Sequence, residues 1–134
     1  MSQENVDVVR RAYEALAHGG LDRFIEHLTD DVEYRTIEGD PDDIGPIRGK
    51  DAVRAWLQDW AHTFDEFWFE PIELIDAGKD TVVVVERYGG RAKLSGVETD
   101  QTVGVVLTIR DGKIARGREY PGRQQALEAA GLAE

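Results

Sequence analysis

Residues 53–70 read VRAWLQDWAHTFDEFWFE, and within this stretch the spacing of the apolar side chains changes. Up to Phe64 they recur at intervals of three and one, which is the broad apolar face of a helix. From Phe67 to Phe69 they alternate with other positions, as in a strand. A helix therefore leads directly into extended chain. Strand patterns then continue to about Tyr120, so the sequence predicts an α+β protein with its helices first and its strands later.

The chain before this stretch predicts two more helices and one early strand. Apolar residues at helical spacing are followed by Gly19 and Gly20, which favour a helix end. A shorter helix is predicted over residues 21–28, and alternation predicts a strand over residues 32–36. Residues 38–49 are rich in acids, prolines and glycines and predict a loop; the acidic side chains there could suggest calcium, but the spacing lacks the pattern of a calcium loop, which favours a solvated loop.

The chain after this stretch predicts an antiparallel sheet. A turn at residues 76–80 precedes a valine-rich strand over residues 81–88 and a flexible connection. A long strand over residues 97–110 ends at the hairpin signal Asp111-Gly112, after which comes a last strand over residues 114–120. A short helix over residues 124–130 completes the pattern. We expect one domain over residues 1–134, with the three N-terminal helices packed on one face of a curved sheet.

Composition excludes several classes of function. The 134 residues carry a formal net charge of -11, which argues against nucleic acid or an anionic membrane as a partner. The chain has no cysteine, so disulfides, thiolate catalysis and cysteine-bound metals are excluded. The N-terminus has no secretory signal pattern, and no apolar run is long enough to span a bilayer. We expect a cytoplasmic protein that holds no metal.

The motifs along the chain resemble the SnoaL-like branch of the nuclear transport factor 2-like superfamily. The segments that carry the resemblance are VRRAYEA at 9–15, GGLD at 19–22, DDVEY at 30–34, RGKDAV at 48–53, DGKI at 111–114 and YPGRQQALEAAGL at 120–132. The resemblance implies a cone-shaped sheet of the cystatin-like kind that encloses a pocket for a small hydrophobic molecule. It also implies a homodimer formed through the sheet face, and it implies no cofactor.

In such a fold the inward side chains follow strand parity. Val83, Val85 and Arg87 share one face of the valine-rich strand, and Gly117 and Glu119 share one face of the last strand together with Ala115. We expect the inward groups to include Arg87 and Glu119, which would pair because an unpaired buried charge is costly. The small residues before Glu119 would leave open volume.

This arrangement gives the candidate catalytic residues. Glu119 would act as the general base, Arg87 would orient it or stabilise an oxyanion, and Tyr34 would donate a hydrogen bond. The candidate substrate-binding residues share a predicted position on the pocket wall and are Thr36, Trp56, Trp60, Phe64 and Val105. A structural reading stays open for each of them, because ion pairs, core tyrosines and core tryptophans are common.

Known relatives fit this set only in part. The two acids that ketosteroid isomerases need fall at Thr36 and Val105, which cannot serve. Limonene-type epoxide hydrolases would find their arginine at Arg87, an acid at Glu119 and a tyrosine at Tyr34, whereas Gly89 replaces their second acid. Polyketide cyclases of this kind use an aspartate with a histidine, and no inward histidine is evident here.

The sequence therefore predicts a small-molecule enzyme that acts by general acid/base chemistry, of the epoxide hydrolase, isomerase or polyketide cyclase class. The first alternative is a module that binds a hydrophobic ligand without chemistry. The second is a dimeric interaction protein that uses the outward sheet face. We expect that face to carry the following apolar and polar side chains: Val82, Val84, Tyr88, Thr102, Val106 and Thr108.

Overall fold

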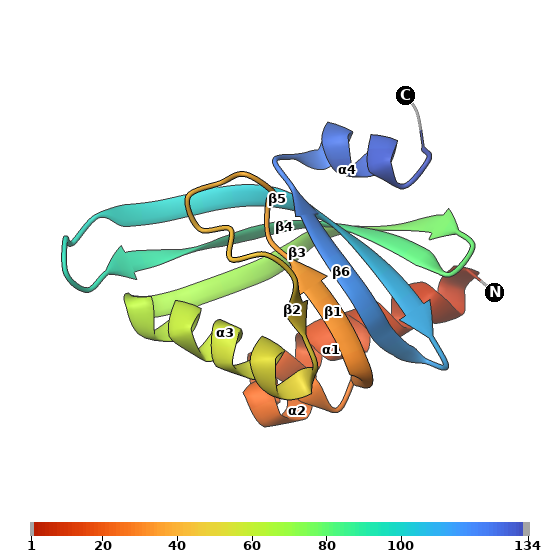
Figure 1. Ribbon diagram of the computed structural model, residues 1–134, viewed down its shortest axis with the longest axis horizontal. Coiled ribbons are helices and arrows are strands. Elements are labelled where there is room, and N and C mark those ends of the chain that lie inside the picture. Colours follow the sequence, from red (N-terminus) through yellow and green to blue (C-terminus); the bar gives the residue numbers. More distant parts are fainter. Residues whose placement is uncertain (1, 133–134) are drawn as a thin grey trace.

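The computed structural model describes residues 2–132 as a curved six-stranded sheet with helices on both of its faces (Figure 1). In chain order the elements are α1 (Ser2–Gly19), α2 (Leu21–Ile25), β1 (Leu28–Arg35), β2 (Ile47–Arg48), α3 (Lys50–Thr63), β3 (Phe64–Gly78), β4 (Thr81–Ala92), β5 (Glu98–Arg110), β6 (Lys113–Tyr120) and α4 (Arg123–Ala129). The predicted fold class is confirmed. None of the helices in this part of the chain has the length and apolar character that crossing a membrane requires.

The change of period at Phe64 marks the junction between α3 and β3. Thr63 is the last helical residue, and Phe64 already has extended backbone angles, φ -118° and ψ 148°. The side chain of Phe64 is buried, so it belongs to the packing between the helix and the sheet. No loop separates α3 from β3, so the start of β3 fixes where α3 lies relative to the sheet.

The strands lie in the order β2-β1-β6-β5-β4-β3. All neighbours pair antiparallel except β1 and β6, which run parallel, with Tyr34 opposite Gly117. Three boundaries differ from the sequence predictions. Residues 28–31 extend β1 where a helix and a break were expected, β2 lies within the expected loop, and β4 continues to Ala92, into the expected flexible connection.

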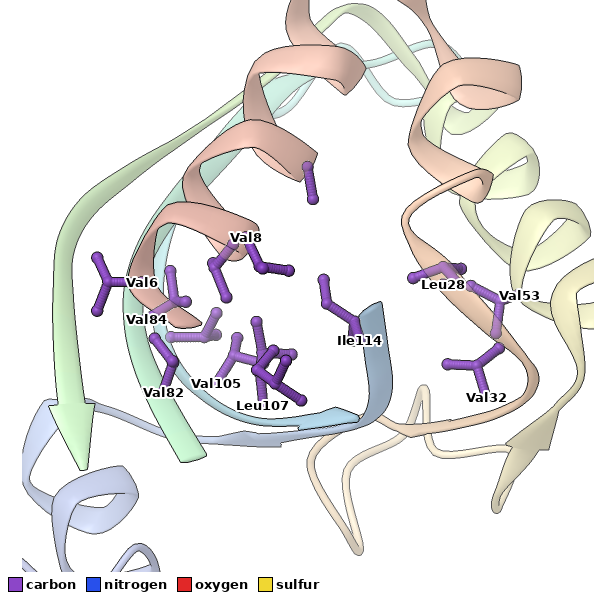
Figure 2. Close-up of a cluster of buried hydrophobic side chains, with 14 of the residues drawn as sticks. Val6, Val8, Leu28, Val32, Val53, Val82, Val84, Val105, Leu107 and Ile114 are labelled. Carbon is purple, nitrogen blue, oxygen red and sulfur yellow. The ribbon is translucent and has the colours of Figure 1, made fainter. Parts of the chain in front are cut away.

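Figure 1 shows α1, α2 and α3 on one face of the sheet and α4 on the other. The main core lies between the sheet and helices α1, α2 and α3. Val6 and Val8 of α1 lie near strand residues Val82, Val84 and Val105 (Figure 2). A smaller core lies under α4, and its buried members are Val83, Ala126 and Leu127. The two faces of β4 therefore carry two different cores.

The predicted facing of β4 was wrong. Val82 and Val84 point toward α1, whereas Val83 lies under α4, the reverse of the expected arrangement. Residues 82–85 are all valine, so they contain no alternation that would distinguish one face from the other. Because successive side chains of a strand point to opposite faces, an error of one residue exchanges every side chain of the strand. The inward set of β4 continues to Glu86 and Tyr88, which line the cavity described below.

The strand β6 contains a β-bulge. Thr108 pairs with Arg116 and Ile109 pairs with Ile114, so Ala115 is an extra residue on β6. A bulge of this kind re-aims the side chains on either side of it. As a result Ile114 and Glu119 line the same cavity, although their spacing along the chain is odd.

Candidate functional site

A cavity of about 100 Å³ lies between the concave face of the sheet and helices α1, α2 and α3. Aliphatic side chains from both sides close it, among them Val105 and Leu107 of β5 and Leu28, Val32 and Val53 across from them (Figure 2). Its other lining residues are aromatic, aliphatic or acidic: Tyr13, Leu16, Phe24, Tyr34, Trp56, Leu57, Trp60, Phe67, Phe69, Glu86, Tyr88, Ile114 and Glu119. The sheet and the helices thus enclose a mostly apolar space that holds two carboxyl groups.

The first carboxyl group is that of Glu119 on β6. The hydroxyl of Tyr34 donates a hydrogen bond of 2.6 Å to its Oε2. Gly117 makes this contact possible, because a Cβ at this position would lie 2.5 Å from Cδ1 of the Tyr34 ring. The ring of Tyr34 therefore lies over the backbone of β6 and occupies the volume that the small residue was expected to leave open. Trp56 packs on the ring, with centroids 5.1 Å apart.

The second carboxyl group is that of Glu86 on β4. The hydroxyl of Tyr13, from α1, donates a hydrogen bond of 2.6 Å to its Oε1. The ring of Tyr13 is held against Phe69 of β3, with centroids 5.7 Å apart. The cavity thus contains two Tyr–Glu pairs of the same kind, and each joins an early segment of the chain to a late one.

Both carboxyl groups titrate near neutral pH. Burial is the main cause that raises the pKa of Glu119 to about 7; the hydrogen bond from Tyr34 opposes it, and the charge of Asp40 adds to it. Burial likewise raises the pKa of Glu86 to about 7, opposed by the hydrogen bond from Tyr13 and increased by the charge of Glu119. A group whose pKa lies near the working pH is suited both to accept and to donate a proton.

The tyrosines beside them remain protonated donors. Burial raises the pKa of Tyr13 and of Tyr34 well above its ordinary value, and the charges of the two glutamates add to this effect. Burial also raises the pKa of Tyr88 to about 12. Because the glutamates affect each other and the same tyrosines, the groups form one electrostatic unit.

The expected pair between Arg87 and Glu119 does not form. Arg87 lies on the other face of β4, where its Nη2 is 2.6 Å from Asp100 and its Nη1 is 3.5 Å from Glu70. Its guanidinium lies over the ring of Trp68, and its side chain is 40% exposed. The inverted parity of β4 is the reason. Because of this inversion, Glu86 lies in the cavity position where Arg87 was expected. The sequence interpretation missed Glu86.

The predicted substrate-binding residues divide into two groups. Trp56, Trp60 and Val105 line the cavity. Phe64 does not line the cavity. Its ring stacks on that of the lining residue Trp60, with centroids 5.6 Å apart. Thr36 is also outside the lining and is buried, and its Oγ1 has no hydrogen-bond partner among residues 2–132. Their roles in binding remain predictions.

One signal in the sequence could have revealed Glu86. It is the first charged residue after four consecutive valines, at the end of a segment that must be buried on both faces. A charge that directly continues such a run needs a buried partner or a solvent-filled space. Across residues 2–132, no cluster of three or more histidine or acidic side chains is placed so that it could hold a metal ion.

Comparison with known proteins agrees with this architecture. Residues 9–117 match the SnoaL-like domain. An uncharacterised protein of Mycobacterium tuberculosis is 30% identical over 125 residues, which cover 93% of this chain and 94% of that protein. An NTF2-like protein from Burkholderia xenovorans is 28% identical, with a TM-score of 0.74 and 97% of each chain covered.

A third protein shares the fold of this chain at low sequence identity. The structure of a Mycobacterium tuberculosis protein in complex with estradiol-17beta-hemisuccinate is 15% identical, with a TM-score of 0.73, and the match covers 87% of this chain and 92% of that one. The match to the domain family spans most of the chain described here. The chain therefore belongs to the SnoaL-like family.

Proposed function

We propose that this protein is a small-molecule enzyme that moves protons within its cavity, with Glu119 as the general base and Glu86 as the general acid. Tyr34 and Tyr13 hold the two carboxyl groups in position through their hydrogen bonds. The observation that carries the proposal is the presence of two carboxyl groups in one apolar cavity, each with a pKa near 7 and each held by a tyrosine.

The assignment of base and acid follows from the coupling between the two groups. Each charge disfavours ionisation of the other, so the pair retains a proton when the first group ionises. Once Glu119 is ionised, its charge raises the pKa of Glu86, so Glu86 keeps its proton. With Glu119 ionised and Glu86 protonated, one group can take a proton from a carbon acid while the other donates to the oxygen that gains charge.

The position of Arg87 bears on the class of reaction. The epoxide hydrolase route implied by the resemblance uses an arginine beside its acids, and here Arg87 is paired with Asp100 on the far face of β4. This favours proton transfer of the isomerase or cyclase kind over epoxide hydrolysis. A fold neighbour that holds a steroid ester supports small-molecule binding in general. The cavity of about 100 Å³ favours a much smaller substrate here, since drug-sized ligands need roughly 300 Å³ or more.

The experiment is a turnover screen with small ketones, enones, polyketide mimics and epoxides, in D₂O so that NMR detects exchange of carbon-bound hydrogen. We expect exchange or conversion by the native protein and a loss of about a hundredfold or more in Glu119→Gln and Glu86→Gln. Glu98→Gln, on the exposed end of β5, is the matched control. Equal rates in the native protein and both cavity variants would refute the mechanism. Ligand-dependent thermal stabilisation with no conversion would instead identify a binding module.

A homodimer and a cytoplasmic location belong to the same proposal. The outer sheet face carries Thr102, Val106 and Thr108, and α4 covers part of it. Sedimentation at micromolar concentration tests the dimer, which would have twice the 15.0 kDa mass of the chain. A species of 15.0 kDa would contradict the dimer and leave the cavity mechanism untouched.

A further inference from the structure

The charges that line the cavity are all of one sign. Its two ionisable acids are Glu86 and Glu119, and none of the described residues that line it is lysine, arginine or histidine. Each acid uses one carboxyl oxygen to accept a tyrosine hydroxyl; within residues 2–132 the other oxygen, Oε2 of Glu86 and Oε1 of Glu119, accepts no hydrogen bond. The cavity thus offers unused acceptors and negative charge, with no cation to compensate it.

We propose that the cavity recognises the positively charged ammonium group of a small organic molecule, by charge pairing with Glu119 and Glu86 and by contact with the surrounding aromatic rings. This inference rests on the cavity being the functional site, as proposed above, and it names the class of substrate. A monovalent cation matches the pair because the two acids share about one negative charge near neutral pH.

The aromatic lining supports the choice of a cation. The rings of Trp60 and Tyr88 meet edge to face, with centroids 5.8 Å apart, and those of Tyr34 and Trp56 lie 5.1 Å apart. The faces of such rings attract cations, most strongly where water is excluded. Phe67 and Phe69 add further aromatic surface to the same cavity. Aromatic faces together with carboxylates form the arrangement that binds substituted ammonium groups.

The other ligand classes fit less well. An anion would meet two acids and find no basic partner in the lining. A neutral apolar molecule would remove water from an ionised carboxylate without replacing its interactions, which costs free energy. An ammonium ion instead pairs with the carboxylate and keeps it in the ionised form. That is the form in which Glu119 accepts a proton, so the inference agrees with the proposed mechanism.

Charged groups outside the lining act on the cavity with the same sign. Asp40, on the loop between β1 and β2, raises the pKa of Glu119, and Asp42 acts with it on Tyr88. The nearby cations of this region are already paired, Arg35 with Asp43 and Arg118 with Glu38. This loop therefore adds negative charge that acts on the cavity groups, which favours a cation.

Size limits the ligand further. An apolar cavity of about 150 Å³ holds a benzene molecule. By the same ratio a cavity of about 100 Å³ holds a group of about four non-hydrogen atoms. Tetramethylammonium is close to this size and has a permanent charge, and tert-butanol is a neutral molecule of similar size.

The test is calorimetric titration of the full chain with these two probes and with acetate. We expect tetramethylammonium to bind at least about tenfold more tightly than tert-butanol, and acetate not to bind. Affinity for tetramethylammonium should fall about tenfold from about pH 8 to about pH 6, because one carboxylate with a pKa near 7 becomes protonated. Titrations in buffers of different ionisation enthalpy should show proton release on binding.

Variants separate this inference from the proposed function. Glu119→Gln and Glu86→Gln should each weaken tetramethylammonium binding about tenfold or more and leave tert-butanol binding within about twofold, whereas Glu98→Gln changes neither. Equal binding of both probes, or binding that does not depend on pH, would overturn the ammonium assignment and leave the cavity as the functional site. A third outcome is that the cavity variants lose hydrogen exchange in D₂O while the native protein does not bind tetramethylammonium. This outcome would reject the ammonium assignment and leave the proposed function in place.

Discussion

The two cavity carboxyl groups should make the folded protein less stable as the pH rises. Burial raises the pKa of Glu119 from 4.5 to about 7. Between these two values the folded state keeps the proton that the unfolded state has lost, so the free energy of unfolding falls with rising pH. At about 1.4 kcal/mol for each pKa unit, the loss is complete above about pH 7 and amounts to about 3 kcal/mol. Burial also raises the pKa of Glu86 to about 7, so its effect on stability has the same direction.

Replacing the carboxyl group removes this cost. We expect Glu119→Gln to be about as stable as the native protein near pH 5 and up to about 3 kcal/mol more stable near pH 8. The amide has nearly the same shape and can still accept the hydrogen bond from Tyr34. The assay is urea unfolding followed by circular dichroism at pH values from about 5 to about 8, with the difference between variant and native protein as the quantity of interest.

The control for this assay is Glu98→Gln, which makes the same replacement of a carboxyl group by an amide on the exposed end of β5. Its difference from the native protein should be small, because the substitution lies on the surface. If Glu119→Gln gave a constant difference across the range, the carboxyl group of Glu119 would titrate alike in the folded and unfolded chains. The assignment of a buried proton-transfer group would then fail.

Three further substitutions test the geometry. Gly117→Ala should destabilise the fold by about 1–3 kcal/mol, because its Cβ would displace the ring of Tyr34. Thermal unfolding measures this loss, and an unchanged melting temperature would contradict the close approach of the ring to β6. Tyr34→Phe should raise the pKa of Glu119 further, since it removes the hydrogen bond that favours the ionised form. Carbon-detected NMR titration follows the carboxyl group, and a lowered pKa would refute the hydrogen bond between Tyr34 and Glu119. Arg87→Ala should cost about 1 kcal/mol or less and leave ligand binding in the cavity unchanged, because its pair with Asp100 is exposed; a large loss of binding would return Arg87 to the site.

The helices and most of the sheet could be predicted because their patterns are local. The apolar face of residues 53–64 and the alternation that follows define α3 and the start of β3 within a few residues. The Asp111-Gly112 signal located the hairpin between β5 and β6. The parallel pairing of β1 with β6 could not be found in this way, because no local pattern shows which distant strand lies beside β1.

The candidate site could be predicted only in part, and strand facing explains the difference. Glu119 and Tyr34 lie in the cavity as expected, because alternation on β1 and β6 is distinct near them. On β4 the valine run hides which face is inward, so Arg87 was expected where Glu86 lies. The contact between Tyr34 and Gly117 depends on neighbouring strands, and a glycine alone does not indicate which ring will cover it.

The parallel pairing of β1 with β6 has a consequence for synthesis on the ribosome. Tyr34 and its partner Glu119 are 85 residues apart in the chain, and Tyr13 and Glu86 are 73 apart. The N-terminal helices and β1 emerge long before β6, and until then the inner edge of β1 has no neighbour. Contacts of such long range form slowly. A nascent or truncated chain without β6 would therefore present apolar surface and an open strand edge to its surroundings, and early termination should yield protein that needs chaperones and has no cavity.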